Sequence, residues 1–185
     1  MDLNKAIQQR KSVRKFKDKK PDWRDIIECI NSARYAPMAG DIYSLKFVLI
    51  DNPEIIQQLA DAAQQPFIAQ TSYVVAVCSI SNKTTNAYGE RGEMYLRQQA
   101  GAGIQNFLLK IEERGLSTCW IGAFSEDQVK DALKIPDNVN VEAFFPIGYE
   151  YEKPRARRAK IELDNILYFN KYGNKNMVAP KIVRD

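Results

Sequence analysis

The chain has 185 residues, 45% of them hydrophobic and 27% charged, which is the composition of a globular protein of one domain. It contains no histidine, and this excludes Ser-His and Cys-His nucleophile pairs, an imidazole acid or base, and zinc sites with mixed histidine ligands. No apolar stretch is long enough to cross a bilayer and none at the N-terminus resembles a signal peptide, so we expect a cytoplasmic protein without a membrane partner.

The formal net charge of +4 hides two basic segments. Residues 10–20 hold seven basic residues and one acid, and residues 153–160 hold five basic residues and no acid. The rest of the chain carries 15 basic and 22 acidic residues, a net charge of −7. Two separate basic segments on an acidic body favour one local anionic ligand over a nucleic-acid surface, which spreads its charge along a face.

The first predicted helix begins after Asp2 and leads into the basic segment. There, Arg10, Ser12 and Arg14 offer donors that suit phosphate oxygens, with a solvated basic turn as the alternative interpretation. Pro21 and Asp22 then open a second helix. Its apolar stripe is expected to face the core: Ile26, Ile27, Ile30 and Ala33.

A loop at 36–41 precedes an apolar run at 45–50 that predicts a strand, and Asn52 and Pro53 mark the start of a helix. The run 73–78 is apolar without interruption, which predicts a strand buried on both faces. Between these elements, Gln64 and Gln65 have amide groups that suit the edge of a heterocycle, although exposed helix ends also carry glutamine.

The polar residues 81–92 predict a mobile loop. From 93 to 114, apolar residues at steps of three and four predict a long helix, roughly 30 Å in length, through the middle of the fold. Alanine and glycine alternate over 100–103, at a cost of about 1 kcal/mol per glycine, so we expect a second helix to pack closely there. A core helix with an irregular middle is the alternative.

A tight apolar segment follows at 116–124, and the capping-box pattern at 125–128 predicts a short helix. Residues 140–149 predict another strand. The residues from 168 onward lack a period, which predicts an extended arm or a disordered tail, so we assign 1–170 to a single domain and 171–185 to the tail. Helices that alternate with short strands predict an α+β or α/β layer fold with one mixed sheet.

Cys29, Cys78 and Cys119 each lie in an apolar pattern, which favours buried reduced thiols over disulfides or a metal site. No segment has the GxGxxG or Walker spacing, so a Rossmann dehydrogenase and a P-loop NTPase are excluded. If the chain is an enzyme, a bound cofactor is the economical source of its chemistry, and no side chain is assigned a catalytic role.

The order of these segments resembles the FMN-dependent nitroreductase family over about residues 3 to 167. The similar parts are the basic segment 10–14, the loop 36–41, residues 105–109 with Gly115 and Leu116, the segment 120–124, and residues 146–149 followed by basic residues. The resemblance implies an α+β nitroreductase-like fold, a central mixed sheet flanked by helices, and a homodimer with the long helix at its interface.

The resemblance also implies an FMN site at that interface. Its residues are Arg10, Lys11, Ser12 and Arg14; Pro37, Met38, Ala39 and Asp41; Gln64 and Gln65; Ile121, Gly122 and Ala123; and Arg157 and Arg158. In it, the two basic segments hold the phosphate and ribityl chain, a glutamine faces the pyrimidine edge, and the N–H groups of Gly122 and Ala123 point at flavin N5 and O4. The loop from Pro37 to Ala39 comes from the partner subunit.

The sequence departs from the family in two places. The loop, which more usually reads Ser-x-Asn-x-Gln-Pro-Trp, has Met38, Asp41, Tyr43, Ser44 and Leu45 at those places, and an acidic residue frequent before the central helix is Gln99 here. Because the chain is short, the segment that covers the flavin in larger members is expected to be small or limited to 81–92.

The resemblance implies a flavoprotein oxidoreductase that takes hydride from NADH or NADPH onto FMN N5 and passes electrons to a small electrophile such as a nitroaromatic, quinone or enone. The alternatives are a relative that consumes flavin or dehalogenates its substrate, a flavin-binding sensor without turnover, and an anionic-ligand or nucleic-acid binding module based on the basic segments. We expect a small-molecule substrate and no nucleic-acid partner.

Overall fold

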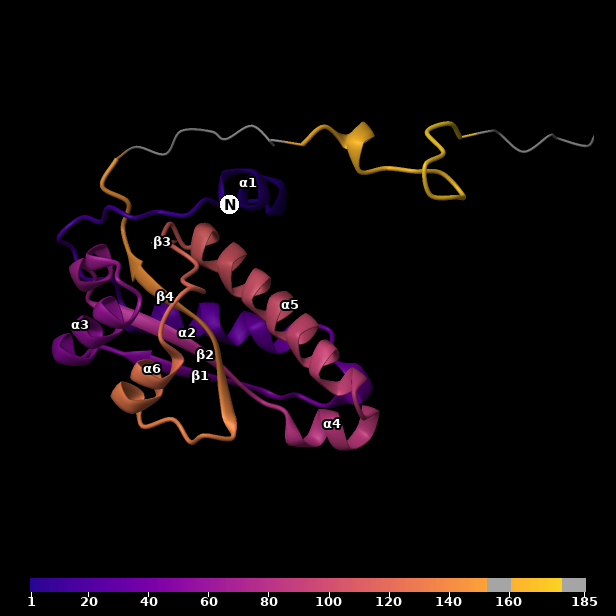
Figure 1. The fold of residues 1–185 in the computed structure, drawn as a ribbon. Coiled ribbons are helices and arrows are strands. Elements are labelled where there is room, and N and C mark those ends of the chain that lie inside the picture. The colour runs from indigo at the N-terminus through magenta and orange to yellow at the C-terminus, as the bar shows by residue number, and fades with distance from the viewer. Residues whose placement is uncertain (153–160, 178–185) are drawn as a thin grey trace, which may run out of the picture.

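The computed structural model describes residues 1–152 and 161–177, and it confirms the α+β fold (Figure 1). The helices are α1 Leu3–Gln9, α2 Trp23–Ser32, α3 Pro53–Ala62, α4 Asn82–Tyr88, α5 Arg91–Glu113 and α6 Glu126–Leu133. The strands are β1 Leu45–Ile50, β2 Tyr73–Ile80, β3 Ser117–Thr118 and β4 Val139–Gly148. Short 3-10 helices lie at η1 Ala33–Tyr35, η2 Ala39–Asp41, η3 Pro66–Gln70 and η4 Leu163–Asn165.

The four strands form one sheet in the order β1-β2-β4-β3, and each neighbouring pair runs antiparallel, whereas a mixed sheet was predicted. Parallel pairing is confined, within the described ranges, to an isolated bridge between Ser12 and Thr118. Strand β2 is buried from Tyr73 through Ser79, which confirms the prediction that its apolar run is covered on both faces.

Helices cover both faces of the sheet. On one face, α2 and α5 pack against Val75 and Phe145, whose neighbour Phe107 on α5 meets Phe145 edge-to-face at 5.4 Å. On the other face, α3 and α6 pack against Val74 and Phe144. Alternate residues of β2 and β4 therefore belong to different cores, which is why neither strand shows a polar face.

Three helices begin where their capping residues predict. The Asp2 carboxylate accepts from the Lys5 N–H at 2.9 Å, and Asp22 and Asn52 cap α2 and α3 in the same way. At α6 the helix is confirmed but the capping box is wrong, because Ser125 makes no side-chain cap bond. Instead, the Glu126 carboxylate accepts from the Val141 N–H at 3.1 Å and holds this helix start against β4.

The long helix α5 confirms the predicted central helix. It begins two residues before the predicted start at 93 and ends one residue before the predicted end at 114. A Cβ at Gly103 would lie 3.0 Å from Leu45 Cδ1 and 3.7 Å from Ala33 Cβ, so the absence of a side chain here lets η1 and β1 approach. Gly101, by contrast, has no neighbour within 4 Å of such a Cβ among the described residues. Close packing therefore accounts for Gly103 but not for Gly101.

Two predictions about local structure are wrong. Residues 81–92 contain the helix α4 where a mobile loop was expected, because Thr84 is buried and Gly92 allows α4 to lie directly on the start of α5. Ile27 does not face the core and is 45% exposed, since the inward stripe of α2 runs through Ile26, Cys29 and Ile30.

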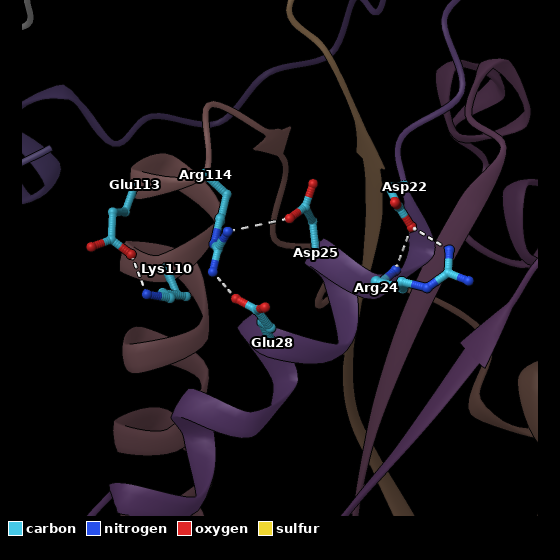
Figure 2. A network of polar contacts seen from close by, with 7 residues as sticks. All are labelled: Asp22, Arg24, Asp25, Glu28, Lys110, Glu113 and Arg114. Carbon is cyan, nitrogen blue, oxygen red and sulfur yellow. Dashed lines mark hydrogen bonds and ion pairs between the residues drawn. The ribbon is translucent and has the colours of Figure 1, made fainter.

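A polar network joins α2 to the C-terminal end of α5 (Figure 2). The Arg114 guanidinium lies between the two helices, 3.4 Å from the Asp25 carboxylate and paired also with Glu28. Lys110 pairs with Glu113 within α5, and that hydrogen bond lowers the pKa of Glu113. Exposed ion pairs stabilise little, so the network fixes how the two helices align more than how tightly they bind.

Cys29, Cys78 and Cys119 are free and buried, as predicted. Burial raises the pKa of the Cys29 thiol to about 12 and that of Cys78 to about 11, so both are neutral and unreactive at pH 7. No helix within the described ranges has both the length and the apolar character that a membrane span needs.

Residues 161–177 lie apart from the body of the molecule in Figure 1, beyond α1. Their hydrogen bonds connect the segment to itself, as from the Phe169 N–H to the Asn174 carbonyl at 2.8 Å. Several of its large apolar side chains are exposed, namely Ile161, Leu163, Ile166, Tyr172 and Met177.

We predict that Gly92→Ala lowers the free energy of unfolding by about 1–3 kcal/mol, the usual cost of overpacking. The added Cβ would lie 2.5 Å from Thr85 Cα, and backbone cannot move aside as a side chain does. Gly101→Ala is the matched control on the same helix, and we expect it to raise stability by about 0.5–1 kcal/mol. Chemical denaturation measures both, and equal changes in the two variants would contradict the packing described for α4.

Candidate functional site

The basic segment lies along the edge of the sheet. Ser12 bridges Thr118, and the Val13 N–H donates to the Thr118 carbonyl at 2.9 Å. Further along, Phe16 is buried beside Gly148, where a Cβ would come within 2.8 Å of its ring. Buried Val13 and Phe16 thus anchor this segment at two points, and Ser12 and Arg14 on either side of Val13 are exposed.

Most lysines of this segment have neighbours that use their charge. Lys11 Nζ lies 2.6 Å from a Glu150 carboxylate oxygen, and Lys15 and Lys19 lie 4.5 Å from the ring centres of Tyr151 and Tyr149. In contrast, neither Arg10 nor Arg14 forms an ion pair with any residue of the described ranges. The two arginines are therefore the better candidates for an anionic ligand, and Lys11 the weaker one.

Half-buried Glu112 on α5 lies close to this site. Burial, reinforced by the charge of Glu150, raises the pKa of Glu112, and the positive charges of Lys11 and Arg10 act against that shift. Glu112 and Glu150 therefore partly balance the positive charges of Arg10 and Lys11 at the start of the basic segment, and Arg14 lies farther along it.

The segment after β3 presents free backbone donors. Ile121 is buried and exchanges two hydrogen bonds with Phe144, at 3.0 and 3.1 Å, which fixes the segment to β4. The next two residues, Gly122 and Ala123, are exposed, and neither N–H donates a hydrogen bond within the described part of the chain. Two unpaired N–H groups on a fixed backbone suit a ligand that carries or gains negative charge.

The predicted glutamines follow α3 near this segment. The Ser125 N–H donates to the Ala62 carbonyl at 2.9 Å, which brings the chain after Ala123 to the end of α3. Gln64 is exposed with a positive φ of 53°, and its neighbour Gln65 is half-buried. Phe67, next along the chain, stacks on Phe16 with a centroid distance of 6.5 Å.

These contacts link the surroundings of three of the segments that the sequence predicted: residues 10–14, residues 64–65 and residues 121–123. The first segment pairs with β3 through Ser12 and Thr118, and the chain after Ala123 bonds to the end of α3, just before Gln64. Phe16 and Phe67, which lie just beyond the first and second segments, stack on each other. Arg157 and Arg158 lie outside the described residues, so the structure does not place the second basic segment.

The loop with Pro37, Met38, Ala39 and Asp41 lies elsewhere. It lines a cavity of about 220 Å³ with Tyr95, Gln98 and Gln99, on the N-terminal half of α5. The basic segment begins near Glu112, in the last turn of that helix, and the axial distance from Gln99 to Glu112 is about 20 Å. One protomer therefore does not bring this loop together with the other three segments.

Sequence reasoning missed two residues at the site. Thr118 is 5% exposed, and its hydroxyl is buried without a hydrogen-bond partner among the described residues. Trp120 is 42% exposed and meets Phe145 edge-to-face at 5.6 Å, so part of the indole faces outward beside Gly122. The sequence indicated only a tight apolar segment around both residues, and it gave no signal that either contributes to the site.

The site suits a cofactor with a phosphate at one end and a polar heterocycle at the other. Arg10, Ser12 and Arg14 belong to the segment that pairs with β3, and the exposed residues Gly122 and Ala123 follow β3 in the chain. The Thr118 hydroxyl, which has no hydrogen-bond partner among the described residues, belongs to β3 itself. A mononucleotide of the flavin type meets these requirements, because its phosphate is anionic and its ring edge donates and accepts hydrogen bonds.

Comparison with known proteins identifies the family of the chain. The model of the Nitroreductase family matches residues 7–71 and 62–149. The chain therefore belongs to the nitroreductase family.

The chain is also similar to individual proteins. The chain is 22% identical over 184 residues to an FMN reductase (NADPH) of Bacillus subtilis, covering 89% of this chain and 74% of that protein. It is 20% identical over 186 residues to an iodotyrosine deiodinase of Thermotoga neapolitana, covering 86% and 95%. Among solved structures, a nitroreductase family protein from Clostridium novyi has a TM-score of 0.76 at 26% identity and covers 94% of this chain and 96% of its own.

Proposed function

We propose that the protein is an FMN-dependent oxidoreductase that uses NADH or NADPH to reduce a small electrophile such as a nitroaromatic, quinone or enone. The observation that carries this proposal is the pairing of the basic segment with β3, through Ser12, Val13 and Thr118. The same stretch of chain continues from β3 to Gly122 and Ala123, whose N–H groups donate no hydrogen bond among the described residues. Membership of the nitroreductase family and the similarity to an FMN reductase (NADPH) support it.

In this proposal each group of residues has its own task. Arg10, Ser12 and Arg14 bind the phosphate as charge-assisted donors, and Lys11 acts indirectly by holding Glu150. Gly122 and Ala123 donate backbone N–H groups to the ring edge, where they favour the reduced form because negative charge develops there. FMN, when bound, supplies the hydride-transfer chemistry. With no histidine in the chain, the protein contributes position and electrostatics rather than an acid or base.

We propose further that the site is completed by a second copy of the chain. The loop 37–41 lies about 20 Å along α5 from the basic segment, so a second protomer is the source that brings such a loop to the same ligand. The exposed apolar side chains of residues 161–177 form a surface that a dimer would cover. We assign the C-terminal residues to an arm on this basis.

We predict that Arg10→Ala weakens FMN binding by about 10- to 100-fold, the loss expected for one charge-assisted hydrogen bond to a phosphate. Fluorescence titration of the apoprotein with FMN measures the affinity, and the visible spectrum of the purified protein reports occupancy. Arg24→Ala is the control, because that arginine is exposed and its partner is Asp22 on the same turn. A variant Arg10→Ala that keeps full flavin occupancy and affinity would show that this residue does not bind the phosphate.

A mixing experiment tests the shared site. We predict that Arg10→Ala and a Met38→Ala/Asp41→Ala variant, each with low activity, regain activity when they are unfolded together and refolded. Half of the dimers are then mixed and each has one intact site, so recovery should reach roughly a quarter of wild-type activity. No recovery in a sample that light scattering shows to be dimeric would mean that each protomer supplies its own loop.

Dehalogenation is the second candidate, favoured by the similarity to the iodotyrosine deiodinase and by the carboxylate of Asp41 in the loop. We predict that NADPH oxidation by the flavin-loaded protein rises at least about tenfold over its rate in air when a nitroaromatic is added, since a bound electrophile is reduced next to the flavin. Iodide release from an iodophenol, with no such rise for the nitroaromatic, would favour the dehalogenase.

A further inference from the structure

The side chain of Gln99 is buried in the middle of α5, with 3% of its surface exposed. Its carbonyl oxygen accepts from the Ser44 N–H at 3.1 Å, and its amide nitrogen donates to the Ile42 carbonyl at 3.1 Å. One side chain thus pairs with the backbone of the loop on both sides of Tyr43, as a neighbouring strand would.

A second buried contact continues from this one. The Ser44 hydroxyl lies 3.0 Å from the Thr84 hydroxyl on α4, and both residues are less than 5% exposed. The Ser44 carbonyl accepts from the Ile80 N–H at 2.9 Å at the end of β2. Through Ser44, the loop is therefore joined to α4, α5 and the sheet at once.

Before Ile42, the loop has an unfavourable backbone conformation and borders a cavity. Gly40 and Asp41 both have positive φ values, 57° and 58°, a conformation that costs energy for Asp41 and needs its surroundings to hold it. A Cβ on Gly40 would clash with the Tyr88 hydroxyl of α4, and Pro37, Met38 and Ala39 line a cavity of about 220 Å³. The loop therefore spans a gap between its attachments.

Glutamine is the side chain that these two backbone groups require. An ionised glutamate could accept from the Ser44 N–H but has nothing to donate to the Ile42 carbonyl, and an apolar residue of the same size would leave both groups unpaired and buried. Gln99 thus has both the donor and the acceptor that the loop backbone needs, and its side chain is long enough to reach them.

We propose that Gln99 is a positioning residue for the loop 37–44, and that the Ser44–Thr84 contact makes this loop and α4 move as one unit. The effect on catalysis rests on the proposed function, in which Met38 and Asp41 face a ligand bound by the partner. Gln99 then determines how far the loop lies from that ligand. Gln99 itself touches neither substrate nor cofactor.

Hydrogen exchange of the protein as purified tests the mechanical part without reference to any activity. In Gln99→Met, the amides of residues 42–44 should exchange at least about tenfold faster than in the wild type, which corresponds to about 1.4 kcal/mol, while β2 and α2 keep their protection. Gln58→Met, at an exposed position of α3, is the matched control. Unchanged exchange at 42–44, or faster exchange throughout the chain, would overturn the proposal.

Steady-state kinetics of the flavin-loaded enzyme test the functional part. We expect Gln99→Met to raise KM for a nitroaromatic about fivefold or more, with kcat within about twofold and FMN affinity near that of the wild type. Should this variant fail to fold, the isosteric Thr84→Val replaces it and should show the same changes at smaller size. A loss of FMN affinity with KM unaltered would refute a positioning role. Absence of flavin binding in the wild type would refute the proposed function and leave the exchange test valid.

Discussion

Burial of the sheet on both faces is the constraint on which the rest of the structure depends. Because β2 and β4 expose almost nothing to water, helices must cover each side, and the connections that carry those helices determine where every loop emerges. The functional segments all lie in such connections or beside the narrow strand β3. The apolar core thus positions the site, because it fixes where these connections begin and end.

The central helix α5 separates the polar features of the molecule into two groups. At its C-terminal end, the basic segment pairs with Thr118 of β3, and the chain beyond β3 bonds to the end of α3. Near its N-terminal end, Gln99 and Tyr88 hold the loop 37–44. A ligand that needs both groups must lie between two molecules, so the helix that organises one protomer also makes a single protomer insufficient in the proposed function.

Local signals in the sequence predicted much of the fold. Capping residues such as Asp22 and Asn52 placed helix starts correctly because their hydrogen bonds are short-range, and the apolar run of β2 identified its double burial. The helix α4 was missed because its contacts depend on Thr84 and Gly92, which have no apolar period. Gln99 was noted only as a departure from a family pattern, since a polar residue gives no sign of burial until its distant partners are known.

The site was predictable in its parts and not in its arrangement. The residue types at 10–14 and 121–123 indicated phosphate and flavin chemistry only through a resemblance, and their proximity depends on bridges across about a hundred residues of chain.

A ligand held between two chains links cofactor retention to assembly. In the proposed dimer, each bound FMN would stabilise the association of the protomers, and dilution that separates them would release it, by mass action. The apparent affinity for the cofactor would then depend on the concentration of the protein itself, and a cell that makes little of this chain would hold it mostly as colourless single subunits.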